Sequence, residues 1–226
     1  MVPSSSPARV QELRAALRLM VITDRRLARG RSTREIATQA LRGGATALQL
    51  RDKEADDRDL LAEAEMVAGL AAHAGAILVI NDRLDVARLA GAAGVHLGPD
   101  DLPLGDARRV MPGPFLIGWS AGTPDEARAA CDAGADYLGV GPVYATGTKA
   151  DAGKPIGLAG LAAVIAASSI PVVAIGGIRE DRAGECIRAG AAGVAVAGAV
   201  VGAASVAPAT RGLRRAVDRA LAESSC

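Results

Sequence analysis

The sequence alternates short, continuous apolar runs with longer amphipathic stretches. Each apolar run has the length of a strand and lacks polar alternation, which is typical of parallel strands covered on both faces. The eight runs are Leu19–Thr23, Ala47–Leu50, Ile77–Ile80, Val95–Leu97, Phe115–Trp119, Tyr137–Val140, Val172–Ile175 and Gly193–Val196. The pattern therefore predicts eight buried parallel strands.

The stretches between the runs carry helix signals. Ser32 and Glu35 have the spacing of a capping box, and Thr123 precedes a proline at the expected first helical position. Glycine recurs just before the next strand, in RGGATAL, AHAGAIL, CDAGADY and RAGAAGV, where it favours a left-handed helix cap. Repeated strand and helix alternation predicts an α/β fold, a (β/α)8 TIM barrel, with a doubly wound open sheet as the weaker alternative.

The chain length suits one such domain. A barrel of this kind takes about 250 residues, and the chain has 226 without an internal linker. We expect residues 1–8 to be disordered, a short extra helix over Val10–Leu17, and a single catalytic barrel domain spanning residues 9–226.

Composition points to a small-molecule partner. The net charge is +1, and one Trp, two Tyr and one Phe offer no stacking surface for bases, so neither nucleic acid nor a membrane surface is expected. The first residues, MVPSSSPARV, lack the pattern of a secretory signal, which favours a cytoplasmic protein. Cys131, Cys186 and Cys226 have no CxxC spacing and are expected to be reduced. A homo-oligomer is compatible with the sequence.

One stretch raises the question of a membrane helix. Residues 189–210 contain no charged side chain, and Gly198 and Gly202 form a GxxxG. The stretch is rich in Ala and Gly and lacks Leu, Ile and Phe, so its transfer energy into lipid is weak. We therefore predict a buried strand followed by a close-packed turn.

Polar residues follow the predicted strands, and the carboxyl ends of barrel strands are where active sites lie. The rare polar types concentrate there. The chain's single asparagine, Asn81, follows the third run, and its three lysines, Lys53, Lys149 and Lys154, lie at or near strand ends although most basic residues are arginine. This distribution predicts a site at that end of the barrel.

Two carboxylates could converge on a cation. Asp82 and Asp101 follow neighbouring strands, and hard oxygen ligands without Cys or His favour Mg²⁺ over zinc. The alternative is that Asp82 caps a helix and that Asp101 belongs to an acidic surface loop. Arg51 and Lys53 could neutralise a diphosphate beside this metal, or form a solvated charged turn.

Other strand ends offer neutral donors. Gln49 and Asn81 could read the edge of a heterocyclic base, or satisfy loop backbone groups. The segment Gly139–Lys154 carries hydroxyls, glycines and lysines that suit a phosphate ester, although an ordinary surface loop is the alternative. The glycines after the last two strands favour close approach of a phosphate to backbone amides. His96 is interpreted as a hydrogen-bonded barrel residue rather than a base.

Six motifs in order, LQLRDK, INDRLDVA, GVHLGPDDL, IGWSAGT, YLGVGPVYATGTK and VVAIGGI, resemble the thiamine phosphate synthase (thiamine-phosphate pyrophosphorylase) family. The resemblance runs from about Leu19 to Val201 and implies a transferase of thiamine biosynthesis. Such an enzyme condenses hydroxymethylpyrimidine diphosphate with hydroxyethylthiazole phosphate, giving thiamine phosphate and pyrophosphate with Mg²⁺ as cofactor. The family reaction is thought to begin with departure of the diphosphate, which leaves a pyrimidine-stabilised cation.

The resemblance also implies roles for individual residues. Asp82 and Asp101 would bind Mg²⁺. The pyrimidine diphosphate would contact Gln49, Arg51, Lys53, Asn81, Ser120 and Lys149, of which Arg51, Lys53, Ser120 and Lys149 would act in catalysis. The thiazole phosphate would contact Thr146, Thr148, Gly177, Ala197 and Gly198. Lys154 matches no ligand motif and is interpreted as a solvated loop lysine.

Three departures from the family pattern stand out. Pro99 replaces a frequent Gln, Ala197 and Gly198 replace a common Ile and Ser, and Gly122 replaces a common His. Two alternatives to the synthase stay open, a thiazole tautomerase-like isomerase and a barrel that binds thiamine phosphates without turnover. Loss of the histidine at Gly122 weakens the first, and the retained acidic pair weakens the second.

Overall fold

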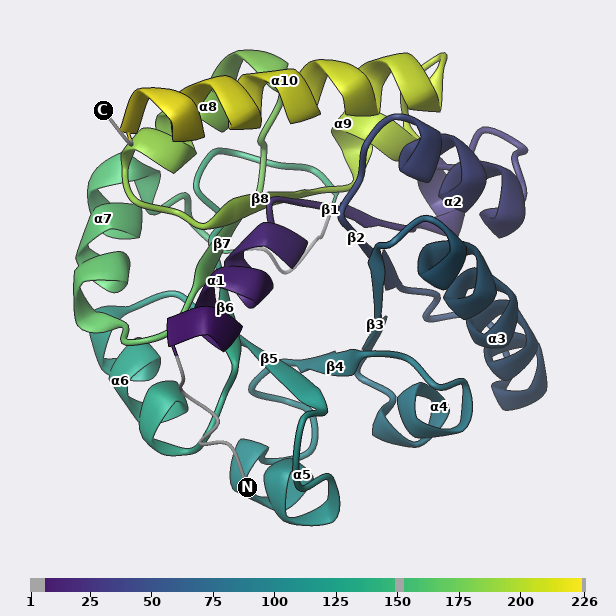
Figure 1. Ribbon diagram of the computed structural model, residues 1–226, viewed down its shortest axis with the longest axis horizontal. Helices are drawn as coiled ribbons and strands as arrows, with labels where there is room; N and C mark the ends of the chain where they lie inside the picture. The colour runs from purple at the N-terminus through teal and green to yellow at the C-terminus, as the bar shows by residue number, and fades with distance from the viewer. Residues whose placement is uncertain (1–6, 149–152, 225–226) are drawn as a thin grey trace.

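The computed structural model describes residues 7–148 and 153–224. Eight parallel strands pair in chain order, and β1 also pairs with β8, so the sheet closes into a barrel (Figure 1). The strands are β1 (Leu19–Ile22), β2 (Ala47–Leu50), β3 (Ile77–Asn81), β4 (Gly94–Leu97), β5 (Leu116–Ala121), β6 (Tyr137–Val140), β7 (Val172–Ile175) and β8 (Gly193–Val196). The predicted barrel is confirmed, and the open sheet is wrong.

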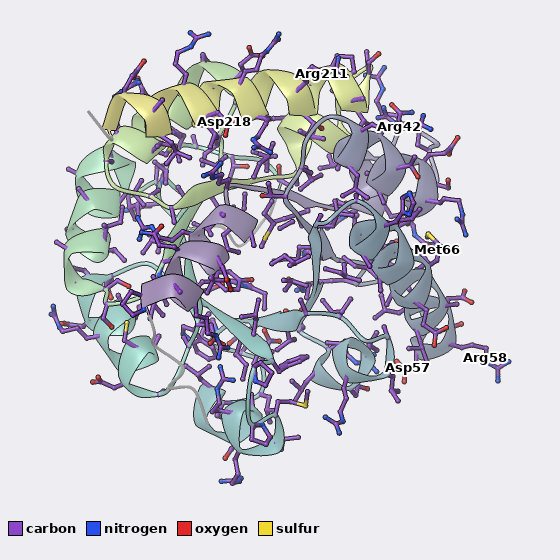
Figure 2. All side chains as sticks on the ribbon, viewed as in Figure 1. Arg42, Asp57, Arg58, Met66, Arg211 and Asp218 are labelled. Atoms are coloured by element: carbon purple, nitrogen blue, oxygen red, sulfur yellow. The ribbon has the colours of Figure 1, made fainter. Side chains whose placement is uncertain are left out.

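Helices surround the barrel and turn their polar sides to solvent. Figure 2 shows Arg58 and Arg211 extending away from the barrel on α3 and α10. The helical elements are α1 (Pro7–Ala16), η1 (Arg25–Leu27), α2 (Thr33–Arg42), α3 (Asp57–His73), α4 (Leu84–Leu89), α5 (Leu104–Val110), α6 (Pro124–Asp132), α7 (Gly157–Ala167), α8 (Glu180–Arg188), α9 (Gly198–Val201) and α10 (Val206–Ser224).

The core has two parts. The larger part lies between the strands and the outer helices, and the smaller part fills the barrel interior around Met20, Val79 and Tyr137. Leu13 of α1 packs against this interior cluster, and Figure 1 shows α1 lying over the centre of the ring of strands. Because α1 leads directly into β1, it covers the amino-terminal end of the barrel and leaves the carboxyl end for a site.

The helix caps predicted from the sequence are present in the structure. Ser32 and Glu35 make both hydrogen bonds of a capping box, and the bond from the Ser32 backbone holds the pKa of Glu35 below its usual value. Thr123 accepts a hydrogen bond from the Glu126 amide at the start of α6. The four recurring glycines all have positive φ, at Gly44, Gly75, Gly134 and Gly190.

Differences from the predicted boundaries are small. The leading helix runs from Pro7 to Ala16 rather than from Val10 to Leu17, and residues 1–6 lie outside the described part. β5 begins at Leu116 and includes Ser120, because Ser120 pairs with Gly139 of β6. The polar character of Ser120 suggests a residue beyond the strand, but the strand ladder continues through it.

The uncharged stretch of residues 189–210 forms β8, the short helix α9 and the first turn of α10. Arg31 donates to the carbonyls of Val201 (2.6 Å) and Ala203 (2.9 Å) at the end of α9. No helix in the described part of the chain is long and apolar enough to cross a membrane. The predicted buried strand is confirmed, and the predicted turn contains one turn of helix.

Gly193 provides a test of barrel closure. A Cβ at this position would lie 1.9 Å from the Leu17 carbonyl oxygen, so Gly193→Ala must move β8 or β1. We expect it to lower the free energy of unfolding by about 1–3 kcal/mol, measured by urea denaturation. Gly69→Ala in α3 is the matched control, because its Cβ would meet nothing within 4 Å and should stabilise the helix. Equal stability of Gly193→Ala and wild type would contradict this account.

Candidate active site

A pocket of about 740 Å³ opens at the carboxyl ends of the strands, with lining residues from all eight strands or the loops that follow them. Every predicted site residue in the described part of the chain lines it. These residues are Gln49, Arg51, Lys53, Asn81, Asp82, Asp101, Ser120, Thr146, Thr148, Gly177, Ala197 and Gly198. Lys149 lies outside the described residues.

Arg51 is held by the end of β1. Its side chain is only 9% exposed, and its Nη1 donates to Asp24 Oδ2 at 3.3 Å. Its backbone amide donates to the Thr23 hydroxyl (2.9 Å), which in turn donates to the Arg51 carbonyl (3.3 Å). Arg51 is thus a fixed cation in the wall of the pocket.

The buried Arg51 guanidinium keeps hydrogen-bonding capacity. Its Nε is buried and has no hydrogen-bond partner among the described residues. A buried donor of this kind is costly unless a ligand supplies an acceptor. Gln49, also buried, lies on the same strand and directs its Nε2 towards Met20 Sδ at 3.7 Å. Both residues are available for polar groups of a ligand.

Asp82 and Asp101 come from adjacent strands, since β3 pairs with β4. Asp82 adopts a left-handed backbone (φ 63°), a conformation that is uncommon outside glycine, and its amide donates to the His96 carbonyl at 2.9 Å. Asp101 Oδ2 accepts from the Gly98 amide at 2.7 Å, which fixes the carboxylate in the loop after β4. The N-cap residue of α4 is Arg83, so Asp82 precedes the cap by one position.

This acidic pair has the chemistry of a magnesium site. Two hard carboxylates line one pocket with Lys53, and Mg²⁺ is usually held by one or two carboxylates together with water and substrate phosphates. The described residues contain no group of three or more His, Cys, Asp or Glu side chains suited to a metal. A donor set of two carboxylates fits Mg²⁺ whose other positions are filled by water or by an anionic ligand.

His96 links two neighbouring strands. Its Nδ1 lies 3.1 Å from the Tyr137 hydroxyl and its Nε2 lies 3.1 Å from Ser120 Oγ. Burial, with a smaller contribution from Asp136, raises the pKa of Tyr137, so this phenol stays protonated. Gly118 and Gly139 leave room for the two rings, since a Cβ there would approach Tyr137 to 2.2 Å and His96 to 2.9 Å. The prediction that His96 is hydrogen-bonded is confirmed, and the residue orients Ser120.

The loops after β6, β7 and β8 meet on the other side of the pocket. Gly177 has φ +64°, and a Cβ on it would lie 2.5 Å from the Ala145 carbonyl oxygen. Thr146 Oγ1 accepts from the Thr148 amide at 3.3 Å, and a Cβ added to Gly198 would lie 3.3 Å from Thr148 Oγ1. Two hydroxyls and a glycine-rich backbone are therefore brought together.

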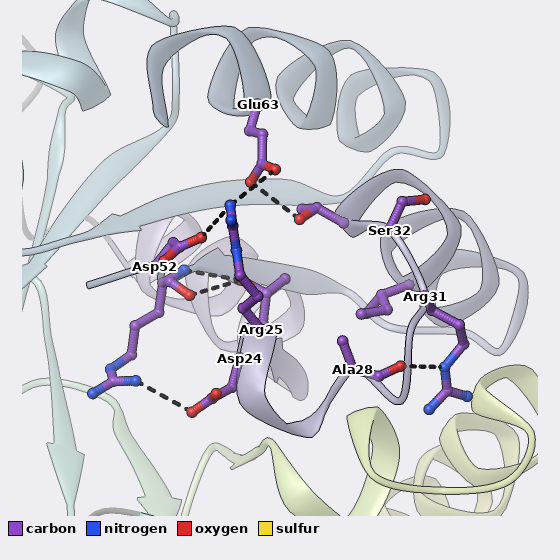
Figure 3. Close-up of a pocket in the computed structure, with 11 residues that line it drawn as sticks. Asp24, Arg25, Ala28, Arg31, Ser32, Asp52 and Glu63 are labelled. Atoms are coloured by element: carbon purple, nitrogen blue, oxygen red, sulfur yellow. Dashed lines mark hydrogen bonds and ion pairs between the residues drawn. The ribbon is translucent and has the colours of Figure 1, made fainter. Parts of the chain in front are cut away.

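A second pocket of about 270 Å³ lies beside the first, and Asp24 and Arg51 line both (Figure 3). Arg25 extends between two carboxylates, Asp52 (2.7 Å) and Glu63 (3.8 Å). The charges that line this smaller pocket are largely compensated by each other. It supports the position of the loop after β1 and gives no case for a charged ligand.

Comparison with known proteins agrees with this arrangement. The family model described as thiamine monophosphate synthase matches residues 19–200. A thiamine-phosphate synthase of Moorella thermoacetica is 52% identical over 202 residues, which are 89% of this chain and 96% of the relative. One from Methanoculleus marisnigri is 50% identical over 205 residues, covering 91% and 97%. The solved structure of thiamine phosphate pyrophosphorylase from Pyrococcus furiosus superposes with a TM-score of 0.87 at 43% identity, covering 92% of this chain and 99% of that one.

The chain belongs to the thiamine monophosphate synthase family.

The three departures from the family pattern noted in the sequence involve four positions, all of which line the pocket. Pro99 is exposed at the pocket, and Ala197 and Gly198 bring no side-chain donor to it. At Gly122 the amide donates to Glu126 Oε2 at 2.6 Å. Gly122 and Glu126 both line the pocket, so this edge carries the Glu126 carboxylate and no side chain from position 122.

Sequence reasoning missed several residues of this thiamine monophosphate synthase pocket. Asp24 is one, although a carboxylate just after the first apolar run is a signal of the kind used for Asp82. Arg179 and Arg182 line the pocket from the start of α8. They follow the glycines after β7 by a few residues, but arginine is so frequent in this chain that its type gives no signal.

Lys154, Cys131 and Cys186, which have no assigned role, are not among the described residues that line the pocket. Lys154 is exposed, as predicted for a solvated loop lysine. Cys186 is buried, and burial raises its pKa to about 11, which makes it an unreactive thiol. Cys131 is half-buried, and Cys226 lies outside the described residues.

Proposed function

We propose that this protein is a transferase of thiamine biosynthesis, a thiamine phosphate synthase that joins hydroxymethylpyrimidine diphosphate to hydroxyethylthiazole phosphate. The observation that carries the proposal is the gathering of all the described predicted site residues around one pocket. The products would be thiamine phosphate and pyrophosphate. The bond between the pyrimidine methylene carbon and the diphosphate oxygen breaks, its electron pair leaves with the diphosphate, and the thiazole nitrogen forms the new carbon–nitrogen bond.

The diphosphate would bind at the end of β2. Arg51 offers a planar guanidinium whose Nε has no partner among the described residues, and Lys53 adds an exposed ammonium. Charge-assisted hydrogen bonds to departing oxygens are stronger than neutral ones and grow as the leaving group gains charge. We assign Lys149 to the same group by resemblance alone.

The pyrimidine would lie deeper, against Gln49 and Asn81. Gln49 is buried, so an amide there can recognise ring nitrogens or an amino group without competition from water. Ser120, oriented by His96 at 3.1 Å, would donate to the diphosphate side. Holding the two reactants in line supplies much of the remaining acceleration.

We assign Mg²⁺ to Asp82 and Asp101. When bound, the metal would neutralise charge on the diphosphate oxygens. The chain's own contribution is the position of the two carboxylates, fixed by the Asp82 backbone and by the hydrogen bond from Gly98 to Asp101. No general base is required, because the reaction transfers no proton in the step that forms the new bond.

The thiazole phosphate would bind opposite, at Thr146, Thr148, Gly177, Ala197 and Gly198. Because Ala197 and Gly198 lack side-chain donors, contacts there would come from backbone amides. We further propose that the protein acts in the cytoplasm on these small molecules without a nucleic-acid or membrane partner. A homo-oligomer stays a prediction from the sequence.

A pyrophosphate-release assay tests the proposal. Incubation with both substrates and Mg²⁺ should release pyrophosphate and form thiamine phosphate, and each substrate alone should give neither product. Turnover of the thiazole phosphate alone, without metal, would instead indicate an isomerase. Binding of thiamine phosphate by calorimetry with no turnover would indicate a non-catalytic barrel.

A further inference from the structure

The pocket has two basic sides. Among the described lining residues the lysines and arginines are Arg51 and Lys53 after β2, and Arg179 and Arg182 after β7. In the closed barrel these two strands are separated by β1 and β8. Two separate basic sides match two phosphorylated substrates, and only the first side is explained by the roles assigned above.

Arg182 is held in its place by neutral groups. Its guanidinium carbon lies 4.6 Å from the centre of the Tyr144 ring, and its Nη1 donates to the Gly177 carbonyl at 3.2 Å. Tyr144 is itself fixed by a hydrogen bond to Glu185 at 2.6 Å. Stacking on an aromatic ring orients an arginine without cancelling its charge.

Arg182 and Arg179 differ in their ion pairs among the described residues. Among the described residues no carboxylate forms a salt bridge with Arg182, whereas neighbouring Arg179 pairs with Asp181 at 3.1 Å. Arg182 is half-buried and Arg179 is exposed. Of the two arginines on this side, Arg182 is therefore the one with both a fixed position and an available charge.

The side of the pocket next to Arg182 needs a positive charge if it is to bind a phosphate ester. A phosphate monoester carries close to two negative charges at neutral pH. Thr146, Thr148 and Gly177 offer only hydroxyl and backbone donors, and Ala197 and Gly198 add no side-chain donor. Hydroxyls and amides alone leave the charge of the ester uncompensated.

We infer that Arg182 is a substrate-binding residue that contacts the phosphate of the thiazole substrate. This inference rests on the proposed function and deepens it by giving the thiazole-phosphate side of the pocket its cation. The Gly177 carbonyl and the Tyr144 ring hold one part of the guanidinium, so its remaining N–H groups can donate to phosphate oxygens.

The test compares KM values for the two substrates. We expect Arg182→Met to raise the KM for the thiazole phosphate by about 10- to 100-fold and to leave the KM for the pyrimidine diphosphate within about twofold. Arg182→Lys should raise the KM for the thiazole phosphate less than Arg182→Met does, because lysine keeps the positive charge but lacks the planar guanidinium with its paired N–H donors. Arg188→Met is the control, because it removes the same charge from the same helix at an exposed position paired with Glu223.

The unphosphorylated thiazole alcohol separates a phosphate contact from general damage. Wild type should prefer the phosphorylated form, and Arg182→Met should lose most of that preference while its circular dichroism spectrum and melting temperature match wild type. An unchanged preference, or an equal loss for both forms, would overturn the inference. If wild type shows no turnover at all, the proposed function fails, and calorimetric binding of the thiazole phosphate to both proteins still decides the role of Arg182, with equal affinities rejecting it.

Discussion

Asp101→Asn is expected to lower turnover by at least about 100-fold and to raise the Mg²⁺ concentration needed for half-maximal rate. Asparagine keeps an oxygen that can accept from the Gly98 amide, a bond of 2.7 Å in the wild-type protein. The loop after β4 should therefore keep its shape while the proposed metal ligand loses its negative charge. Pyrophosphate release measured over a Mg²⁺ titration gives both quantities.

Asp101→Ala removes the charge and the loop hydrogen bond together. A rate loss larger than that of Asp101→Asn would measure the contribution of loop position. Asp106→Asn in α5 is the control, because it neutralises a nearby carboxylate that pairs with Arg109 outside the pocket. Wild-type rates and an unchanged Mg²⁺ requirement in Asp101→Asn would show that Asp101 serves only the loop.

Local patterns explain why the barrel could be predicted. Continuous apolar runs and glycine caps are properties of neighbouring residues, and each predicted strand lies within two residues of its observed ends. The polar residues at the strand ends could be collected by the same logic, since the fold rule places those ends together. The predicted residues therefore line one pocket without any distance having been known in advance.

Contacts between distant segments could not be predicted in this way. Arg51 pairs with Asp24 across 27 positions, and His96 reaches Tyr137 across 41. Arg182 is recognisable only through its stacking on Tyr144 and its bond to Gly177. In a chain rich in arginine, the residue type carries little information until the structure shows which guanidinium is held in place.

Rarity of a residue type is a useful but incomplete signal. It identifies Asn81 and Lys53, which line the pocket, but it also favours Lys154, which does not. The difference is that Lys154 lies just before α7, which begins at Gly157, and does not follow a strand directly. Position relative to a strand end thus discriminates better than residue type.

Arg51→Met is expected to remove activity and to destabilise the protein, by two separable effects. The substitution deletes the fork that would hold the diphosphate, which should lower kcat/KM by about 1,000-fold or more. It also leaves Oδ2 of Asp24, a residue only 4% exposed, without its partner at 3.3 Å. Breaking a buried pair from one side typically costs about 3–5 kcal/mol of unfolding free energy, and the cost here should fall below that range because Arg26 Nε stays 3.6 Å from Asp24 Oδ1.

A double-mutant cycle separates the two effects. Asp24→Asn in the Arg51→Met background removes a buried carboxylate that keeps Arg26 Nε at 3.6 Å from its Oδ1, so the double variant should regain part of the stability and none of the activity. Asp24→Asn alone should keep the guanidinium but loosen it, because the remaining restraint on Arg51 is its backbone bonding to Thr23. Urea and heat denaturation give the fraction of Arg51→Met that is unfolded under assay conditions. If the loss of activity equalled that fraction, Arg51 would be a structural residue. Full inactivity in a refolded, stable double variant would instead assign it to the diphosphate.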